Sequence, residues 1–422
     1  MRIRSLFQSE DNKRLLANIF SLGTIQVVNY ILPLLTVPYL VRVLEPDFFG
    51  LLAFATATVS YLVMITDYGF NLSATRQISI NRENQVRVNE LFNATMMIKF
   101  GLMVLSFLIL CILVLSIEKF SQNAILYFIT FGMVVGQFLF PVWLFQGMEK
   151  MKYITYINVS TKVIFTVCIF IFIKEQGDYL LVQGLTAASF VISGLLSLLL
   201  ARKKFQVYFY IPPKDVIMKQ LQEGWHIFTS NLAISLYTTS TTFILGIFTN
   251  NTLVGYYAAA EKIIQAAKGL NAPVSQAMYP LISKKIHKNK AQGLRFLTRA
   301  GKRIGTVMLI ISGILFVFSV PISNILLGEQ YQESIQLLRL MAFLPFIIAI
   351  SNLFAVQGLY NLGKESIVSR YLSIIACLHL GVISVMIVFY GIVGAAIGVL
   401  ITETMVSICS IYYFKKELRY ES

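Results

Sequence analysis

Long apolar segments, separated by short polar or charged stretches, recur along the whole 422-residue chain. A helix of about 20 apolar residues crosses the ~30 Å hydrocarbon core of a membrane. Twelve such segments are predicted, near residues 15–40, 49–68, 93–116, 123–145, 155–174, 179–201, 224–248, 253–281, 303–327, 335–359, 366–390 and 393–414. The short alternating segments typical of a membrane β-barrel do not occur. The pattern therefore predicts an all-α integral membrane protein.

The two halves of the chain resemble one another. Phe49–Ala55 resembles Val254–Ala260, and similar pairs occur on the fourth and tenth and on the sixth and twelfth segments. Each pair is separated by about half the chain, which predicts a parallel repeat of two six-helix bundles, 1–210 and 211–422. Two bundles around a central cavity are a transporter architecture, and the alternative is a static membrane scaffold.

Composition and charge agree with a membrane protein. The chain is 57% hydrophobic and 13% charged, with a mean hydropathy of +0.72, whereas a soluble domain carries about 25% charged residues. If the N-terminus is cytoplasmic, most of the 35 lysines and arginines fall on the cytoplasmic side. The basic residues then left outside are Arg42, Lys119, Lys174 and Arg339. This asymmetry predicts that both termini are cytoplasmic and explains the net charge of +15 without nucleic acid.

Ionisable residues within the apolar segments are costly and usually face a cavity. Glu261, Gln265 and Lys268 follow i, i+4, i+7 spacing and share one helix face. We expect this face to line a polar cavity; the alternative is that these charges pair with neighbours and balance one another. Glu403 lies in the middle of the twelfth segment and is a candidate proton or cation site.

Other polar residues within the segments have two interpretations. Asn231 and Thr238 lie at helical spacing in the seventh segment, and Asn29 lies in the first. They can line the same cavity, or they can form hydrogen bonds between helices. Lys99 and Lys162 lie near cytoplasmic segment ends, where snorkelling and a functional role are equally good explanations.

The stretch from Asp67 to Arg76 follows the second apolar segment, and Gly69 can end that helix. One interpretation is an interfacial cap with an Asp67–Arg76 ion pair. The other is the cytoplasmic mouth of the cavity, with Asp67 acting at a gate.

The sequence indicates no catalytic or nucleotide site. Gly358–Glu365 resembles a phosphate-binding loop, but Glu365 replaces the Ser or Thr that would bind Mg²⁺, and the stretch joins two membrane helices. No spacing of residues predicts a metal site or a nucleophile. We therefore expect a transporter rather than an enzyme, with no cofactor. Its drive would be an H⁺ or Na⁺ gradient, the membrane potential or the substrate concentration.

Several motifs resemble the Wzx O-antigen flippases, which belong to the polysaccharide transporter branch of the multidrug/oligosaccharidyl-lipid/polysaccharide exporter superfamily. The resemblance runs from about residue 13 to 416 and is carried by Leu32–Arg42, DYGFNLSATRQIS at 67–79, Pro141–Lys152, Gly224–Phe228 and Asn271–Pro280. It implies a MATE-like fold of twelve helices in two bundles. It also implies movement of undecaprenyl-diphosphate-linked repeat units from the cytoplasmic to the periplasmic leaflet of the bacterial inner membrane.

The resemblance gives roles to the polar residues. Hydrogen-bonding residues expected to contact the sugars are Asn29, Asn231, Thr238 and Gln265. Cations expected to contact the diphosphate are Arg42, Arg76, Lys99 and Lys268. Acids expected to act in ion coupling or gating are Asp67, Glu261 and Glu403.

The expected partners are the lipid-linked oligosaccharide and membrane lipids, with a polysaccharide polymerase and a chain-length regulator as further candidates. The main alternative function is a multidrug or cation antiporter of the same superfamily, against which the intramembrane lysines argue. A third alternative, a polymerase or ligase of the same pathway, is disfavoured because the predicted external loops are short.

Overall fold

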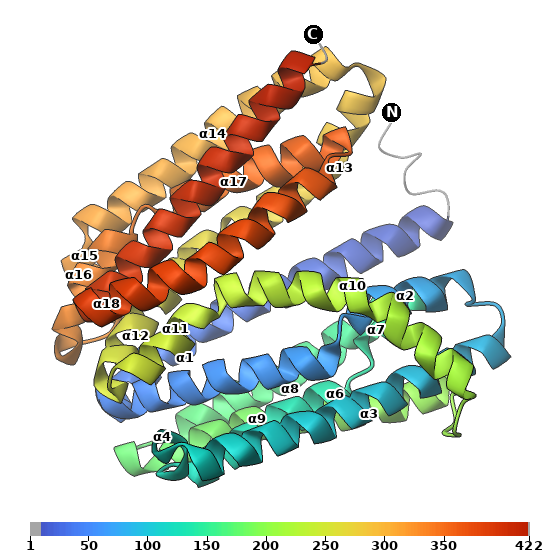
Figure 1. Cartoon of the computed structure of the whole chain (residues 1–422), viewed down its shortest axis with the longest axis horizontal. Coiled ribbons are helices and arrows are strands. Elements are labelled where there is room, and N and C mark those ends of the chain that lie inside the picture. The colour runs from blue at the N-terminus through green and yellow to red at the C-terminus, as the bar shows by residue number, and fades with distance from the viewer. Residues whose placement is uncertain (1–9, 421–422) are drawn as a thin grey trace. The chain divides into compact units, whose positions relative to one another are not determined.

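The computed structural model describes residues 10–420, and this part of the chain is almost entirely helical, without a strand (Figure 1). The helices of the N-terminal half are α1 (Glu10–Asp67), α2 (Phe70–Ile80), α3 (Gln85–Ser116), α4 (Glu118–Ser121), α5 (Ala124–Thr130), α6 (Gly132–Leu139), α7 (Val142–Gly147), α8 (Met151–Phe172) and α9 (Tyr179–Phe205). Those of the C-terminal half are α10 (Lys214–Thr238), α11 (Ser240–Phe248), α12 (Asn251–Gly269), α13 (Asn271–Lys288), α14 (Lys290–Val317), α15 (Ser319–Leu326), α16 (Gln332–Met341), α17 (Leu344–Phe354) and α18 (Glu365–Tyr420). A π-helical turn spans Ala355–Leu359.

Within the described residues, 8 helical segments are long and apolar enough to cross a membrane, or 9 if the bent pair α10 and α11 is one span. The all-α membrane fold is thereby confirmed, whereas the count of twelve stays a prediction. Two of the segments, Leu32–Ile80 with 49 residues and Glu365–Leu418 with 54, are each longer than two crossings of ~30 Å at about 1.5 Å per residue.

Both long helices contain a kink. The backbone of α1 is non-helical at Glu45 (φ 59°), and that of α18 at Gly391 (φ 57°). Glu45 precedes Pro46, whose ring disfavours helical geometry at the residue before it. Gly391 has no Cβ and adopts positive φ readily.

The chain forms two compact units that are not contiguous in sequence. Unit 1 contains Met1–Leu32 and Ala55–Leu232, and unit 2 contains Pro33–Phe54 and Ala233–Ser422. Helix α1 thus contributes to both units. The predicted bundles 1–210 and 211–422, and their repeat symmetry, stay predictions. Both chain ends, residues 1–9 and 421–422, lie outside the described residues. The predicted cytoplasmic location of the termini concerns these residues and stays a prediction.

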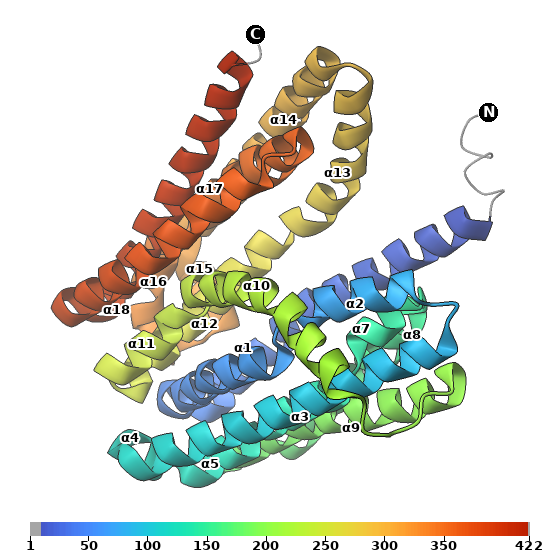
Figure 2. The same cartoon turned by 45° about the vertical axis from the view of Figure 1, so that its right-hand side comes forward.

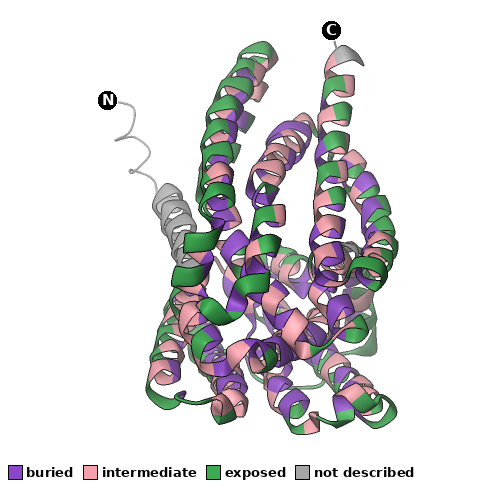
Figure 3. Ribbon diagram, turned by 90° about the vertical axis from the view of Figure 1, so that its left-hand side faces the viewer, coloured by how far each residue is buried: buried purple, intermediate pink, exposed green. Residues whose placement is uncertain are grey.

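The helices have buried and exposed faces, and many of the exposed side chains are apolar (Figure 3). On α3, for example, Phe100, Leu108 and Leu115 are exposed while Phe92 and Leu110 are buried. Exposed apolar surface of this extent is unfavourable in water and suits contact with lipid.

Small residues allow close helix packing inside unit 1. Helix α6 packs on α9, and Gly132, Gly136 and Gly194 lie at their contact. A Cβ on Gly194 would lie 2.6 Å from Cβ of Leu139, closer than atoms pack. Glycine at these positions lets the two backbones approach.

Unit 2 contains a similar contact, and it joins the two motifs that suggested an internal repeat. A Cβ on Gly50 of α1 would collide with the backbone of Asn251, and a Cβ on Gly255 of α12 would collide with the backbone carbonyl of Pro46. The α1 segment of unit 2 therefore packs on α12, the helix that carries the predicted polar stripe.

Candidate functional site

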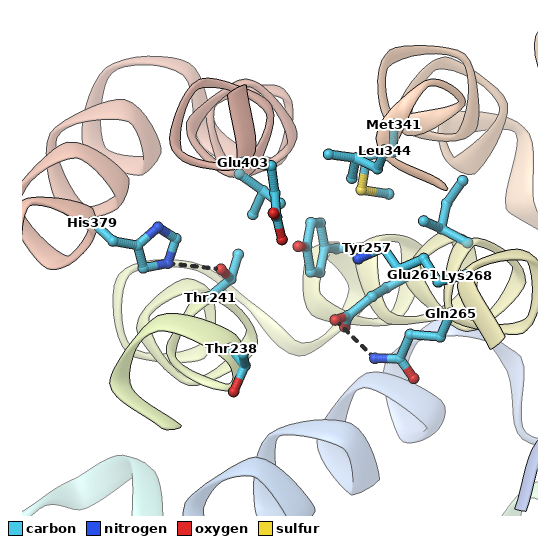
Figure 4. A pocket seen from close by; sticks show the side chains of 12 residues that line it. Thr238, Thr241, Tyr257, Glu261, Gln265, Lys268, Met341, Leu344, His379 and Glu403 are labelled. Atoms are coloured by element: carbon cyan, nitrogen blue, oxygen red, sulfur yellow. Dashed lines mark hydrogen bonds between the residues drawn. The ribbon is translucent and has the colours of Figure 1, made fainter. Parts of the chain in front are cut away.

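Unit 2 encloses a cavity of about 180 Å³ whose walls come from α10, α11, α12, α16, α17 and α18 (Figure 4). Its polar lining residues include Thr238, Thr241, Glu261, Gln265, Lys268 and Glu403. A drug-sized ligand needs about 300–1,000 Å³, and a water needs roughly 10–15 Å³ of such space. The cavity can therefore hold several waters or a small ion, but it is too small for the whole head group of an oligosaccharide.

The polar stripe of α12 lies on the cavity wall. Glu261 accepts a hydrogen bond from Nε2 of Gln265 at 3.0 Å and another from Oγ1 of Thr242 at 3.2 Å. Lys268, one turn further along, lines the same cavity. The i, i+4, i+7 spacing thus brings a carboxylate, an amide and an ammonium group together. Asn250 caps α12 by accepting from the backbone N–H of Leu253 at 2.9 Å, which fixes the start of the helix.

Glu403 reaches the cavity from α18, and its carboxylate points toward the hydroxyl of Tyr257 (Figure 4). Two carboxylates from different helices, Glu261 and Glu403, therefore line one small cavity that also contains a lysine. Such a set can bind a proton or a cation, because the charge of each carboxylate adds to the local negative potential.

Sequence reasoning missed His379, because an isolated histidine belongs to no recognisable motif. Its side chain is buried, and its ring lies between two threonines, with Nε2 3.4 Å from Oγ1 of Thr241 and Nδ1 3.1 Å from Oγ1 of Thr402. Thr402 donates its proton to the carbonyl of Gly398 at 2.8 Å, so it accepts from Nδ1–H. Nε2 lies next to the hydroxyl of Thr241, which can donate or accept a hydrogen bond. These residues are far apart in sequence, so no local motif could reveal them.

Unit 1 contains a buried ion pair at the end of α1. The side chain of Lys99 is fully buried, with Nζ 3.3 Å from Oδ1 of Asp67 and 3.1 Å from the carbonyl of Gln137. Asn71 donates to Oδ2 of Asp67 at 2.7 Å. Snorkelling therefore does not explain Lys99, since its amine points into the protein rather than to the interface.

The ion pair of Asp67 also differs from the expected Asp67–Arg76 pair. Tyr68 (φ 46°) and Gly69 (φ 77°) are both left-handed, so the chain turns directly after Asp67. Arg76 lies exposed on α2, two turns beyond this break. Lys99 approaches Asp67 from α3 instead.

The remaining candidates lie elsewhere. Asn29 of unit 1 accepts a hydrogen bond from Nζ of Lys162 at 2.6 Å, which joins α1 to α8. Asn231 is half-buried on the part of α10 that belongs to unit 1. Arg42 belongs to unit 2, but its exposed guanidinium donates to the carbonyl of Ile325 at the end of α15. The structure thus gathers Thr238, Gln265, Lys268, Glu261 and Glu403 in the cavity of unit 2 and places Asn29, Asp67, Arg76, Lys99 and Asn231 in unit 1.

Solved structures show which fold this is. The chain matches the lipid II flippase MurJ in an inward closed conformation with a TM-score of 0.71 and 12% identity, over 95% of this chain and 87% of that one. It matches an inward-facing multidrug resistance MATE family transporter of the MOP superfamily with a TM-score of 0.68 and 14% identity, over 92% and 95% of the two chains. The predicted MATE-like fold class is confirmed.

Sequence relatives show the family. A protein of Escherichia coli (strain K12) that carries the name of O-antigen transporter is 30% identical over 390 residues, which is 92% of this chain and 94% of that protein. The model of the polysaccharide biosynthesis protein family matches residues 15–286, more than half of the chain. The chain is therefore a multi-pass membrane protein that belongs to the polysaccharide biosynthesis protein family.

Proposed function

We propose that this protein is a flippase for undecaprenyl-diphosphate-linked O-antigen or related polysaccharide repeat units. It would move them from the cytoplasmic to the periplasmic leaflet of the bacterial inner membrane. The observation that carries the proposal is the 30% identity, over 92% of the chain, to a relative named as an O-antigen transporter. The transporter fold and the polar residues within the spans support it.

The substrate has three chemically different parts, and the protein offers groups suited to each. The sugar head needs hydrogen-bonding side chains such as Asn29, Asn231, Thr238 and Gln265. The diphosphate needs cations, for which Arg42, Arg76, Lys99 and Lys268 are the candidates. The polyprenyl tail is apolar and can stay in lipid, next to the exposed apolar faces of the helices.

We place ion coupling in the cavity of unit 2. Its volume of about 180 Å³ suits a hydrated ion better than an oligosaccharide. Glu261 and Glu403 would take up H⁺ or Na⁺ there, and the ammonium of Lys268 would compete electrostatically with the bound cation. Asp67 would act at a gate in unit 1, because its contact with Lys99 lies directly before the turn at Tyr68 and Gly69.

The proposed topology has both termini in the cytoplasm, as the distribution of basic residues indicates. A polysaccharide polymerase and a chain-length regulator are proposed as periplasmic-side partners, because the flipped unit is their substrate class.

Deletion of the gene in its native strain tests the function. Surface polysaccharide should disappear and lipid-linked repeat units should accumulate, and expression of this chain should restore both. Unchanged polysaccharide together with altered efflux of cationic dyes would overturn the proposal in favour of a multidrug antiporter. Expression of a chain with Lys268→Ala, present at normal level, should restore export only in part.

A further inference from the structure

The end of α13 and the start of α14 form an antiparallel hairpin, residues 284–303, that we call the basic hairpin (Figures 1 and 2). It carries exposed cationic side chains on both helices: Lys284, Lys285, Lys288, Arg295, Arg299, Lys302 and Arg303. The sequence has no acidic residue between Glu261 and Glu329, so the hairpin has no carboxylate of its own. Its positive charge is therefore not balanced within the hairpin itself.

The basic hairpin is rigidly built. Asn289 at the turn caps α14 by accepting from the backbone N–H of Gln292 at 2.9 Å. A Cβ on Gly293 would lie 2.6 Å from the backbone nitrogen of Ile286, so the two helices are in close contact at the turn. Nζ of Lys285 lies 4.3 Å from the ring centroid of Phe296, a cation–π contact between the helices.

The base of the hairpin is anchored in the core of unit 2. Ile282 on α13 and Leu297 on α14 are buried in one cluster with Leu353, Tyr371 and Phe414. The helix backbones that carry the cations are therefore held in place. Arg295, Arg299 and Lys302 follow i, i+4, i+7 spacing and share one face of α14.

The hairpin extends beyond the apolar part of α14. The apolar part of α14 begins at Ile304, and the helix starts at Lys290, which is about 20 Å further along its axis. A lipid headgroup layer is only ~5–7 Å deep. Lys302 and Arg303 directly precede this apolar part, whereas Arg295 lies about 13 Å from it along the helix. The tip carries Lys284, Lys285 and Lys288. With α14 upright in the bilayer, a flat leaflet meets only a minority of these charges.

From this geometry we infer that the basic hairpin is a docking surface for an acidic segment of a cytoplasmic protein. Arginine binds carboxylates in a bidentate manner, and a row of carboxylates on a helix or an extended segment complements cations spaced along one helix face. A single exposed ion pair is weak, so binding requires several of these cations together. The inference rests on the cytoplasmic placement within the proposed function and adds a partner to it.

Binding of a fluorescent deca-glutamate peptide tests the surface. The full-length protein is placed in phosphatidylcholine nanodiscs, and the probe is followed by fluorescence anisotropy. Joint replacement Lys284→Gln, Lys288→Gln, Arg295→Gln and Arg299→Gln should weaken binding about tenfold. The matched control carries Arg202→Gln, Lys203→Gln, Lys204→Gln and Lys214→Gln, which removes four exposed cations from unit 1, and should change binding by less than about twofold. Equal weakening by both variants would overturn the inference.

A second measurement distinguishes a protein partner from the leaflet. Ala291→Trp places a reporter next to the turn, and its added fluorescence should be unquenched by nitroxide-headgroup lipids in phosphatidylglycerol nanodiscs. Strong quenching would place the tip in the leaflet and overturn the inference.

A third measurement separates partner binding from transport. In cells, the four-residue hairpin variant should lower polysaccharide export at normal protein level. In proteoliposomes, it should move lipid-linked oligosaccharide at the wild-type rate, and an equal loss there would overturn the inference. The peptide measurement does not involve transport, so a failure of the proposed function is recognised separately.

Discussion

Gly69 and its neighbour Tyr68 turn the backbone after α1 through left-handed conformations. A Cβ on residue 69 would be strained by about 1–2 kcal/mol and would lie 2.6 Å from Cγ2 of Ile227. Gly69→Ala should therefore lower the melting temperature of the purified protein, followed by tryptophan fluorescence. Gly363→Ala is the control that isolates the backbone strain, because Gly363 has φ +71° but no atom lies within 4 Å of the methyl group that alanine would add. Equal losses in the two variants would contradict the predicted steric contribution.

The buried Lys99 makes a second prediction at this scale. Lys99→Met leaves Asp67 without its cation in a poorly solvated position, at a cost of about 3–5 kcal/mol. The double variant Asp67→Asn with Lys99→Met removes both charges and should regain much of that stability. Thermal unfolding of the wild type, the two single variants and the double variant in detergent forms a double-mutant cycle. Additive losses would show that the two charges do not interact.

Side chains that meet across helices mark the limit of prediction from sequence. The stripe Glu261, Gln265 and Lys268 was predictable, because one helix face fixes its spacing. The pairing of Asp67 with Lys99 was not, because the Asp67–Arg76 alternative is closer in sequence and the turn at Tyr68 is set by packing. His379 was not predictable either, because its partners Thr241 and Thr402 are distant in sequence.

At the level of helices, the contact between α1 and α12 predicts where substitution is least tolerated. Gly255→Ala would push a methyl group into the carbonyl of Pro46, where the atoms it meets are backbone and no flexible side chain can yield. We expect a large loss of folded protein, measured by fluorescence-detected size-exclusion chromatography of a tagged chain. Gly313→Ala on α14 is the control, because no atom lies within 4 Å of the added methyl group. Normal folding of the Gly255 variant would contradict the observed packing.

Helix boundaries were harder to predict than helices. The apolar runs correctly indicated membrane-spanning helices, because about 20 apolar residues have few alternatives in a membrane. The break near Glu45 was expected as a loop, yet a single non-helical residue before Pro46 is enough to redirect α1. Whether one residue is enough to redirect the helix depends on how the flanking helices pack, and hydropathy does not contain that information.

At the scale of the whole molecule, the coupling proposal predicts that the transport rate no longer responds to the ion gradient when the cavity acids are neutralised. Glu261→Gln and Glu403→Gln should each reduce transport of lipid-linked oligosaccharide in proteoliposomes to the rate seen without an H⁺ or Na⁺ gradient. Glu329→Gln, an exposed acid outside the cavity, is the control and should keep the wild-type gradient response. A full gradient response in both cavity variants would remove these acids from the coupling role.

Fold class and family were accessible from the sequence, since hydropathy fixes the class and motifs in both halves carry the family resemblance. The two bundles 1–210 and 211–422 stay a prediction. An even repeat suggests two contiguous halves, and the packing of residues 33–54 with the C-terminal part of the chain, such as that of Gly50 against α12, depends on contacts that hydropathy does not contain.

Because residues 33–54 belong to unit 2, the parts of that unit are synthesised at different times. Residues 33–54 leave the ribosome well before Ala233, the first later residue of their unit. At ~5–20 residues per second, the intervening stretch of about 180 residues takes on the order of 10–35 s to make. Val41, Leu44 and Gly50 are all buried in the finished protein, and throughout that interval the C-terminal part of their unit does not yet exist. The nascent chain therefore carries this segment of α1 without its later packing partners until unit 1 has been made.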